Sequence, residues 1–114
     1  MNWWIKKTTD RIQVLSDFIE KEPNDPFNKY ALAMEYQAQQ NLKADSLFQE
    51  LLNKHSEYLP TYYQAAHFYW EQNNLELAEE IFKNGIELAQ KVNDAKTLAE
   101  LKNAYQNFQF EIEE

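Results

Sequence analysis

The side chains in this chain of 114 residues that could carry out catalysis form no recognisable active-site pattern. There is no cysteine, which excludes thiolate nucleophiles, thiolate metal sites and disulfides. The only two histidines, His55 and His67, fall on different expected helices and have no metal-binding spacing. The carboxylates Glu76, Glu79 and Glu80 are best explained as a solvated helix face. With no glycine-rich phosphate loop and no HExxH motif, the sequence predicts no enzyme, metal or cofactor.

Aromatic side chains recur instead at a spacing that suits binding. Tyr63, His67 and Trp70 stand at i, i+4 and i+7, so they share one face of a helix. A second stripe with the same spacing begins one residue earlier, at Tyr62, and is turned from the first by about 100°. We expect the stripe from Tyr62 to pack in the core and the stripe from Tyr63 to bind, because aromatic residues are enriched in binding hot spots. The alternative is that Tyr63 and Trp70 pack against the C-terminal helix.

The elements that position these residues are two amphipathic helices over 59–89, joined by a polar turn at 72–74. Ala66 and Ala78 supply small side chains where the two helices must approach closely, and Phe82 fills the space beside them. Gly85, the only glycine, falls inside the second helix, where it costs about 1 kcal/mol relative to alanine. Close approach of a neighbouring helix explains a glycine at this position.

The same pattern occurs once more upstream. Ala44 precedes Ala78, and Phe48 precedes Phe82, by 34 residues in each case. A period of 34 with small and aromatic residues at fixed places resembles the tetratricopeptide repeat, whose pattern is W-x2-L-G-x2-Y followed by A-x3-F and P. The chain departs from that pattern at Lys29, where the family prefers tryptophan, and at Ser56, where it usually has proline.

The resemblance implies an all-α fold, a right-handed α-solenoid of antiparallel helix hairpins with about six helices. We expect one domain covering the whole chain. Its predicted parts are an N-terminal extension (1–9), a half repeat (10–22), a first repeat (26–56), a second repeat (59–90) and a capping helix (95–112).

The resemblance also implies a function, a non-catalytic protein–protein interaction module that acts as an adaptor or assembly factor. In such proteins the first helices of the repeats line a concave groove that takes a peptide or helix of a partner protein. The lysine, asparagine and arginine residues that clamp chaperone tails in one subtype of the family are missing from this face. The partner-binding residues predicted here are Tyr30, Met34, Gln37, Tyr63, His67 and Trp70.

Composition limits the remaining choices. The net charge of −8 argues against nucleic acid, which needs a basic face. No apolar run is long enough to span a membrane, and we expect a cytoplasmic protein. The rival hypothesis is a self-associating structural protein that forms a homo-oligomer through Trp3, Trp4 and the end helices.

Overall fold

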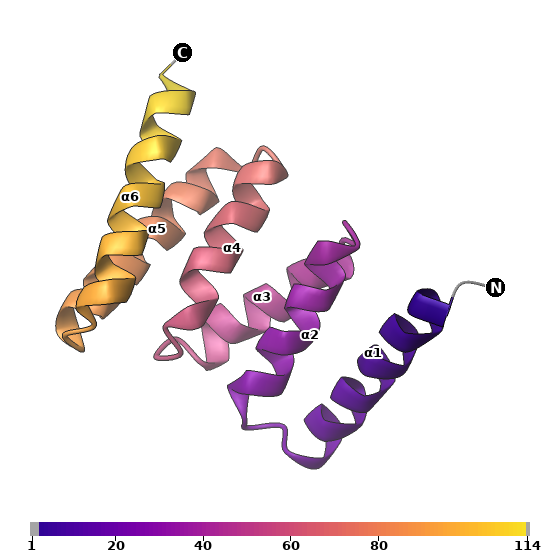
Figure 1. The fold of residues 1–114 in the computed structure, drawn as a ribbon. Helices are drawn as coiled ribbons and strands as arrows, with labels where there is room; N and C mark the ends of the chain where they lie inside the picture. The colour runs from indigo at the N-terminus through magenta and orange to yellow at the C-terminus, as the bar shows by residue number, and fades with distance from the viewer. Residues whose placement is uncertain (1–2, 114) are drawn as a thin grey trace. The chain divides into compact units, whose positions relative to one another are not determined.

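The computed structural model describes the backbone of residues 3–113 and the side chains of residues 10–113. This part of the chain folds into α-helices and contains no β-strand, and none of its helices is long and apolar enough to cross a membrane. The helices are α1 (Trp3–Lys21), α2 (Pro26–Ala38), α3 (Lys43–Lys54), α4 (Pro60–Glu71), α5 (Leu75–Lys91) and α6 (Ala95–Ile112), as Figure 1 shows.

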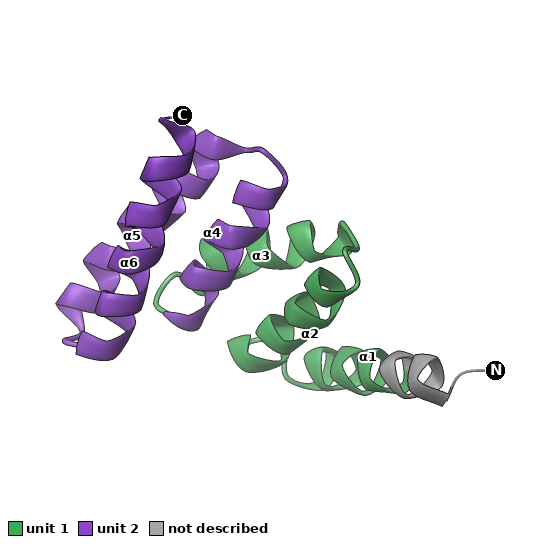
Figure 2. Cartoon of the chain, turned by 45° about the horizontal axis from the view of Figure 1, so that its top comes forward, with its two compact units in different colours: residues 1–58 green, residues 59–114 purple. Residues whose placement is uncertain are grey.

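The helices group into two compact units, residues 1–58 and residues 59–114 (Figure 2). In the first unit α2 packs against both α1 and α3, and in the second unit α5 packs against both α4 and α6. The helix expected to begin near Asp10 begins at Trp3, so α1 includes most of the segment that we expected as an extension. The single domain covering the whole chain stays a prediction.

Three of the connections between helices are the same tight turn. Each contains one residue in the left-handed region, with φ of 56° at Gln40, 61° at Asn73 and 60° at Asn93. The next residue donates its amide hydrogen to a carbonyl five positions back, which closes a Schellman motif. These bonds run from Asn41 to Tyr36 (2.8 Å), from Asn74 to Tyr69 (2.9 Å) and from Asp94 to Ala89 (3.0 Å).

The residue after each left-handed position leads directly into the next helix. The Asn74 side chain accepts a hydrogen bond from the backbone of Leu77 at 3.4 Å, and Asp94 is the N-cap of α6. Asp94 accepts from both the backbone N–H (3.0 Å) and the hydroxyl (2.8 Å) of Thr97. These bonds, the backbone one foremost, stabilise the carboxylate and lower the pKa of Asp94 below its ordinary value.

The first unit contains a buried lysine at its centre. Lys29 is only 4% exposed, and its Nζ donates to the carbonyl oxygen of Pro23, to Oε1 of Glu50 at 3.3 Å and to Nε2 of His55 at 3.2 Å. These partners come from the α1–α2 connection, from α3 and from the residue that ends α3. The ammonium therefore joins three segments at the position where the tetratricopeptide pattern has tryptophan.

The second unit is built around the closest approach of its helices. Ala66 on α4 and Ala78 on α5 are both fully buried, as predicted for close-contact positions. A Cβ added at Gly85 would lie 2.7 Å from the Cβ of Tyr62 and 3.3 Å from Cδ1 of Leu101. The prediction that a neighbouring helix explains Gly85 is confirmed, since α4 leaves no room there for a side chain.

This contact predicts the effect of adding one methyl group. Gly85→Ala improves helix propensity by about 1 kcal/mol but forces the new Cβ against the rigid base of the Tyr62 side chain. We expect a net loss of about 1–2 kcal/mol in the free energy of unfolding, measured by urea denaturation followed by circular dichroism.

Asn84→Ala is the matched control, because Asn84 is exposed on the same helix. It should leave stability unchanged or raise it by about 0.5 kcal/mol. A Gly85→Ala variant as stable as the Asn84→Ala variant would contradict the close contact between α4 and α5.

Candidate functional site

The candidate site begins with three rings on one face of α4. Tyr63, His67 and Trp70 are each half-buried, and they follow one another along the helix. The ring centroids of Tyr63 and His67 are 4.4 Å apart, and those of His67 and Trp70 are 5.6 Å apart. The predicted stripe therefore exists as a continuous row of rings, each tilted against the next.

His67 is held in place by its own helix. Its Nδ1 lies 2.8 Å from the backbone carbonyl oxygen of Tyr63, one turn earlier. A carbonyl oxygen only accepts hydrogen bonds, so Nδ1 carries the proton of the neutral ring. The other ring nitrogen, Nε2, is then an acceptor, which gives the row of rings a polar atom for a ligand.

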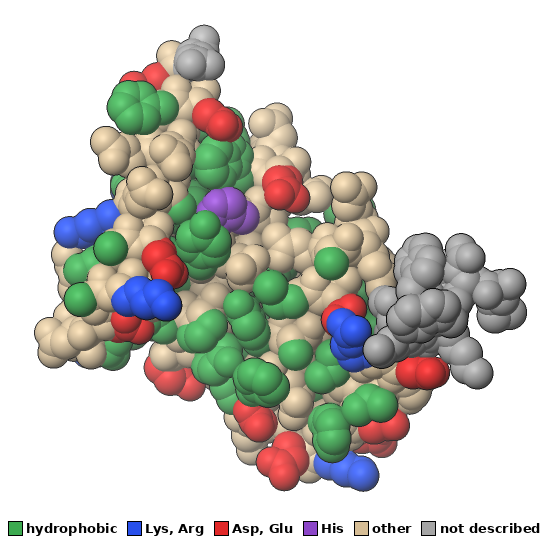
Figure 3. Space-filling view, viewed as in Figure 1, with side chains coloured by type: hydrophobic (Ala, Val, Ile, Leu, Met, Phe, Trp, Pro, Cys, Tyr) green, Lys and Arg blue, Asp and Glu red, His purple; other side chains and the backbone are tan. Residues whose placement is uncertain are grey.

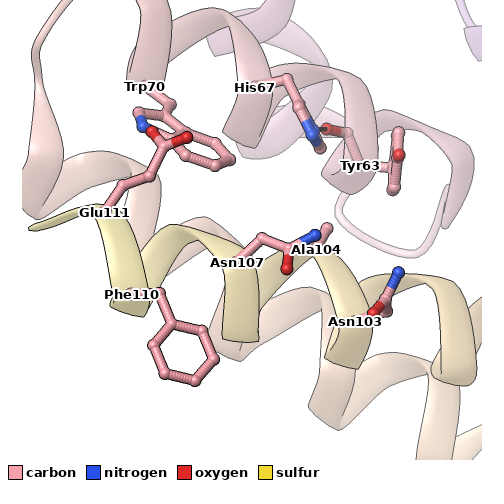
Figure 4. A pocket seen from close by; sticks show the side chains of 8 residues that line it. All are labelled: Tyr63, His67, Trp70, Asn103, Ala104, Asn107, Phe110 and Glu111. Carbon is pink, nitrogen blue, oxygen red and sulfur yellow. Dashed lines mark hydrogen bonds between the residues drawn. The ribbon is translucent and has the colours of Figure 1, made fainter.

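A pocket lies between this face of α4 and the facing side of α6, and we call it the α4–α6 pocket. Its volume is about 490 Å³, within the range of ligand-binding clefts in proteins. Figure 4 shows the row of rings on one wall and side chains of α6 on the other. The lining residues are Tyr63, His67, Trp70, Asn103, Ala104, Asn107, Phe110 and Glu111.

The α6 helix closes one side of the pocket without filling it. Trp70 meets Phe108 edge to face, with centroids 5.2 Å apart and ring planes at 88°, and it also contacts Phe82 at 6.3 Å. Phe108 is fully buried. Trp70 thus packs against the C-terminal helix, as the alternative expected, and at the same time contributes to the wall of the pocket.

The other three predicted binding residues lie on α2, in the first unit. Tyr30 packs edge to face on Tyr58 with centroids 5.7 Å apart, and Met34 and Gln37 are half-buried. Burial, and to a lesser degree the neighbouring Tyr58, raises the pKa of Tyr30 above its ordinary value. Tyr30 is therefore a neutral phenol at physiological pH, and it is partly covered by its own unit.

Sequence reasoning missed the wall that α6 contributes. Asn103, Asn107 and Glu111 recur every four residues, which places them on one face of that helix. The sequence predicts this segment only as a capping helix. The spacing of these three polar residues was the signal that could have indicated a second wall.

The surface over α4 and α6 combines apolar and acidic character. Figure 3 shows hydrophobic side chains gathered around a histidine there, with acidic side chains nearby. No group of three or more His, Cys, Asp or Glu side chains with metal-binding geometry occurs within the part of the chain that the structure describes. The arrangement suits the binding of an organic group by rings and hydrogen bonds.

Comparison with solved structures finds proteins that are similar to this chain. A solution NMR structure of a tetratricopeptide repeat domain protein from Salinibacter ruber is 34% identical, with a TM-score of 0.71. The match covers 76% of this chain and 89% of that one. A crystal structure of a tetratricopeptide repeat domain protein from the same organism is also 34% identical, with a TM-score of 0.70. Here the match covers 75% of this chain and 97% of the other.

No protein-family model matches the chain, and a search of curated proteins finds no match either. The two structural relatives are nevertheless similar to this chain in sequence as well as in fold, over most of its length. They confirm the predicted fold class, an all-α solenoid built from helix hairpins of the tetratricopeptide type.

The two aromatic ends of the row should respond differently to truncation. Trp70→Ala removes a ring that packs on buried Phe108, so we expect a loss of about 3 kcal/mol in the free energy of unfolding. Tyr63→Ala removes a ring whose described aromatic contact is with His67, so we expect a loss of about 1 kcal/mol or less. Urea denaturation of the two variants measures both values, and equally large losses would show that Tyr63 belongs to the core.

Proposed function

Since the chain belongs to the tetratricopeptide repeat family, we propose that it is a non-catalytic module for protein–protein interaction, an adaptor or assembly factor. Its ligand is a peptide or helix of a partner protein, bound by the aromatic face of the first helices of the repeats. The proposed contact residues are Tyr30, Met34, Gln37, Tyr63, His67 and Trp70.

The observation that carries this proposal is the α4–α6 pocket. A row of three rings forms one wall, and Asn103 and Asn107 bring carboxamide groups to the other. Each carboxamide both donates and accepts hydrogen bonds, which matches the alternating N–H and C=O groups of a peptide backbone. The rings can contact apolar side chains of a peptide, and the carboxamides opposite them can form hydrogen bonds with its backbone. Together these contacts suit peptide recognition.

The lack of cysteine and the acidic composition are consistent with a cytoplasmic location, which we propose for the protein. They support the proposal without identifying the partner. The likeness to the Salinibacter domains supports the same class of function, because helical repeats offer extended surfaces to other proteins.

Self-association is the second candidate, favoured by a different observation. Val14 and Phe18 stand four residues apart on α1, and each is 49% exposed. The tryptophans proposed for this interface, Trp3 and Trp4, have side chains outside the described residues. Light scattering over a range of concentrations, with Phe18→Ala as a comparison, tests this candidate.

A peptide selection tests the main proposal. A library of displayed random peptides is selected on the wild-type chain, and the enriched peptides are measured against Tyr63→Ala and His67→Ala by fluorescence anisotropy. Each substitution should weaken binding by about 1–2 kcal/mol, as truncation of an aromatic anchor does.

Asn84→Ala serves as the control, because Asn84 is exposed on α5 and does not line the pocket. It should bind the enriched peptides as the wild-type chain does. Peptides that bind all of these variants with equal affinity would place the binding surface elsewhere and refute the proposal.

A further inference from the structure

The second unit, which holds the α4–α6 pocket, carries most of the negative charge of the chain. Residues 59–114 contain ten Asp or Glu and four Lys or Arg, whereas residues 1–58 contain nine and seven. The net charge is therefore −6 in the second unit and −2 in the first. A potential of one sign around a cleft attracts ligands of the opposite sign and repels ligands of the same sign.

Inside the pocket the negative charge has a defined position. Glu111 is the only charged residue in the lining, and no Lys or Arg side chain lines it. Figure 4 shows the Glu111 carboxylate turned toward the ring of Trp70, across the pocket from α6, while the Phe110 ring points away from α4. A carboxylate turned toward an aromatic ring is suited to a flat cation, which can stack on the ring and pair with the charge.

The remaining polar atoms of the lining fit the same ligand. The Nδ1–H group of His67 donates a hydrogen bond to the backbone carbonyl of Tyr63, which leaves Nε2 as an acceptor. Asn103 and Asn107 add two carboxamide oxygens. A guanidinium group has five N–H donors in one plane and no acceptor, so it can use several of these acceptors at once.

We propose that the α4–α6 pocket takes an arginine side chain of the partner peptide, stacked on the aromatic row and paired with Glu111. This inference rests on the proposed function, since it names the partner chemistry of the same site. It predicts that the partner segment is basic, in contrast to the acidic chaperone tails bound by one subtype of the family.

The test uses small probes, so that it does not depend on finding the partner. Butylguanidinium chloride is titrated into the full chain, and backbone amide chemical shifts are followed by two-dimensional NMR. N-butylacetamide and sodium butyrate are the neutral and anionic probes of similar size. Butylguanidinium should produce saturable shifts centred on Tyr63, His67, Trp70 and Asn107, and the other two probes should bind about threefold more weakly or not at all.

Two substitutions of glutamate by glutamine distinguish the effect of the Glu111 charge from the effect of the overall negative charge of the second unit. Glu111→Gln should weaken butylguanidinium binding by about threefold or more, because it removes the pairing charge and keeps the shape. Glu113→Gln, which removes the same charge outside the pocket lining, should leave that binding within the error of the wild-type value. Both positions are exposed, so neither substitution should lower the melting midpoint of the protein.

The outcomes separate this inference from the proposed function. If N-butylacetamide binds as well as butylguanidinium and Glu111→Gln has no effect, the cation specificity is refuted while a peptide-binding groove still stands. If no probe shifts the pocket residues, the inference is refuted, and the peptide selection alone decides the proposed function. If Glu113→Gln weakens binding as much as Glu111→Gln does, only the general negative field attracts the cation, and a specific arginine site is refuted.

Discussion

The second unit depends on the close contact of α4 and α5 at Gly85. The two helices are so near that a Cβ at this position would lie 2.7 Å from the Cβ of Tyr62. Only glycine fits at this position without a shift of Tyr62, and the small residues Ala66 and Ala78 on the same two helices are fully buried. Glycine is unfavourable inside a helix, but the packing of α4 on α5 that it permits stabilises the unit by more than this cost.

This contact determines which face of α4 remains for a ligand. The stripe from Tyr62 is used for packing on α5, so the stripe one residue later is turned away by about 100° and faces α6. The same approach places Leu101 of α6 beside Gly85, and Phe108 then meets Trp70 and Phe82. The helix that caps the core thereby becomes the second wall of the pocket. Core packing and the proposed binding surface use adjacent stripes of one helix, which explains why Trp70 both packs on Phe108 and lines the pocket.

Much of the fold could be predicted from the sequence because it depends on local chemistry and on period. The repeat of 34 residues and the polar turn at 72–74 can both be recognised from residue types at fixed spacings. The small residues Ala66, Ala78 and Gly85 indicate close helix contacts by their size and spacing alone. The prediction of a binding stripe on α4 likewise depends only on the spacing of its three rings.

The features that sequence reasoning missed depend on partners distant in the chain. Lys29 gave no sign of burial, because its partners Glu50 and His55 are more than 20 residues away and a lysine is ordinarily solvated. The polar stripe of α6 resembled an ordinary solvated face until α4 was placed opposite it. In both cases the role of a residue depends on a second helix that packs against it. The periodicity of one helix cannot show which segment that will be.

The central claim is that the ligand lies between α4 and α6, and intermolecular nuclear Overhauser effects test it most directly. The measurement uses the labelled chain in complex with the strongest peptide from the selection. The account predicts contacts from the peptide to the rings of Tyr63, His67 and Trp70 and to the side-chain amides of Asn103 and Asn107. Contacts confined to α1, or to the solvent-facing side of α5 around Asn84, would contradict it.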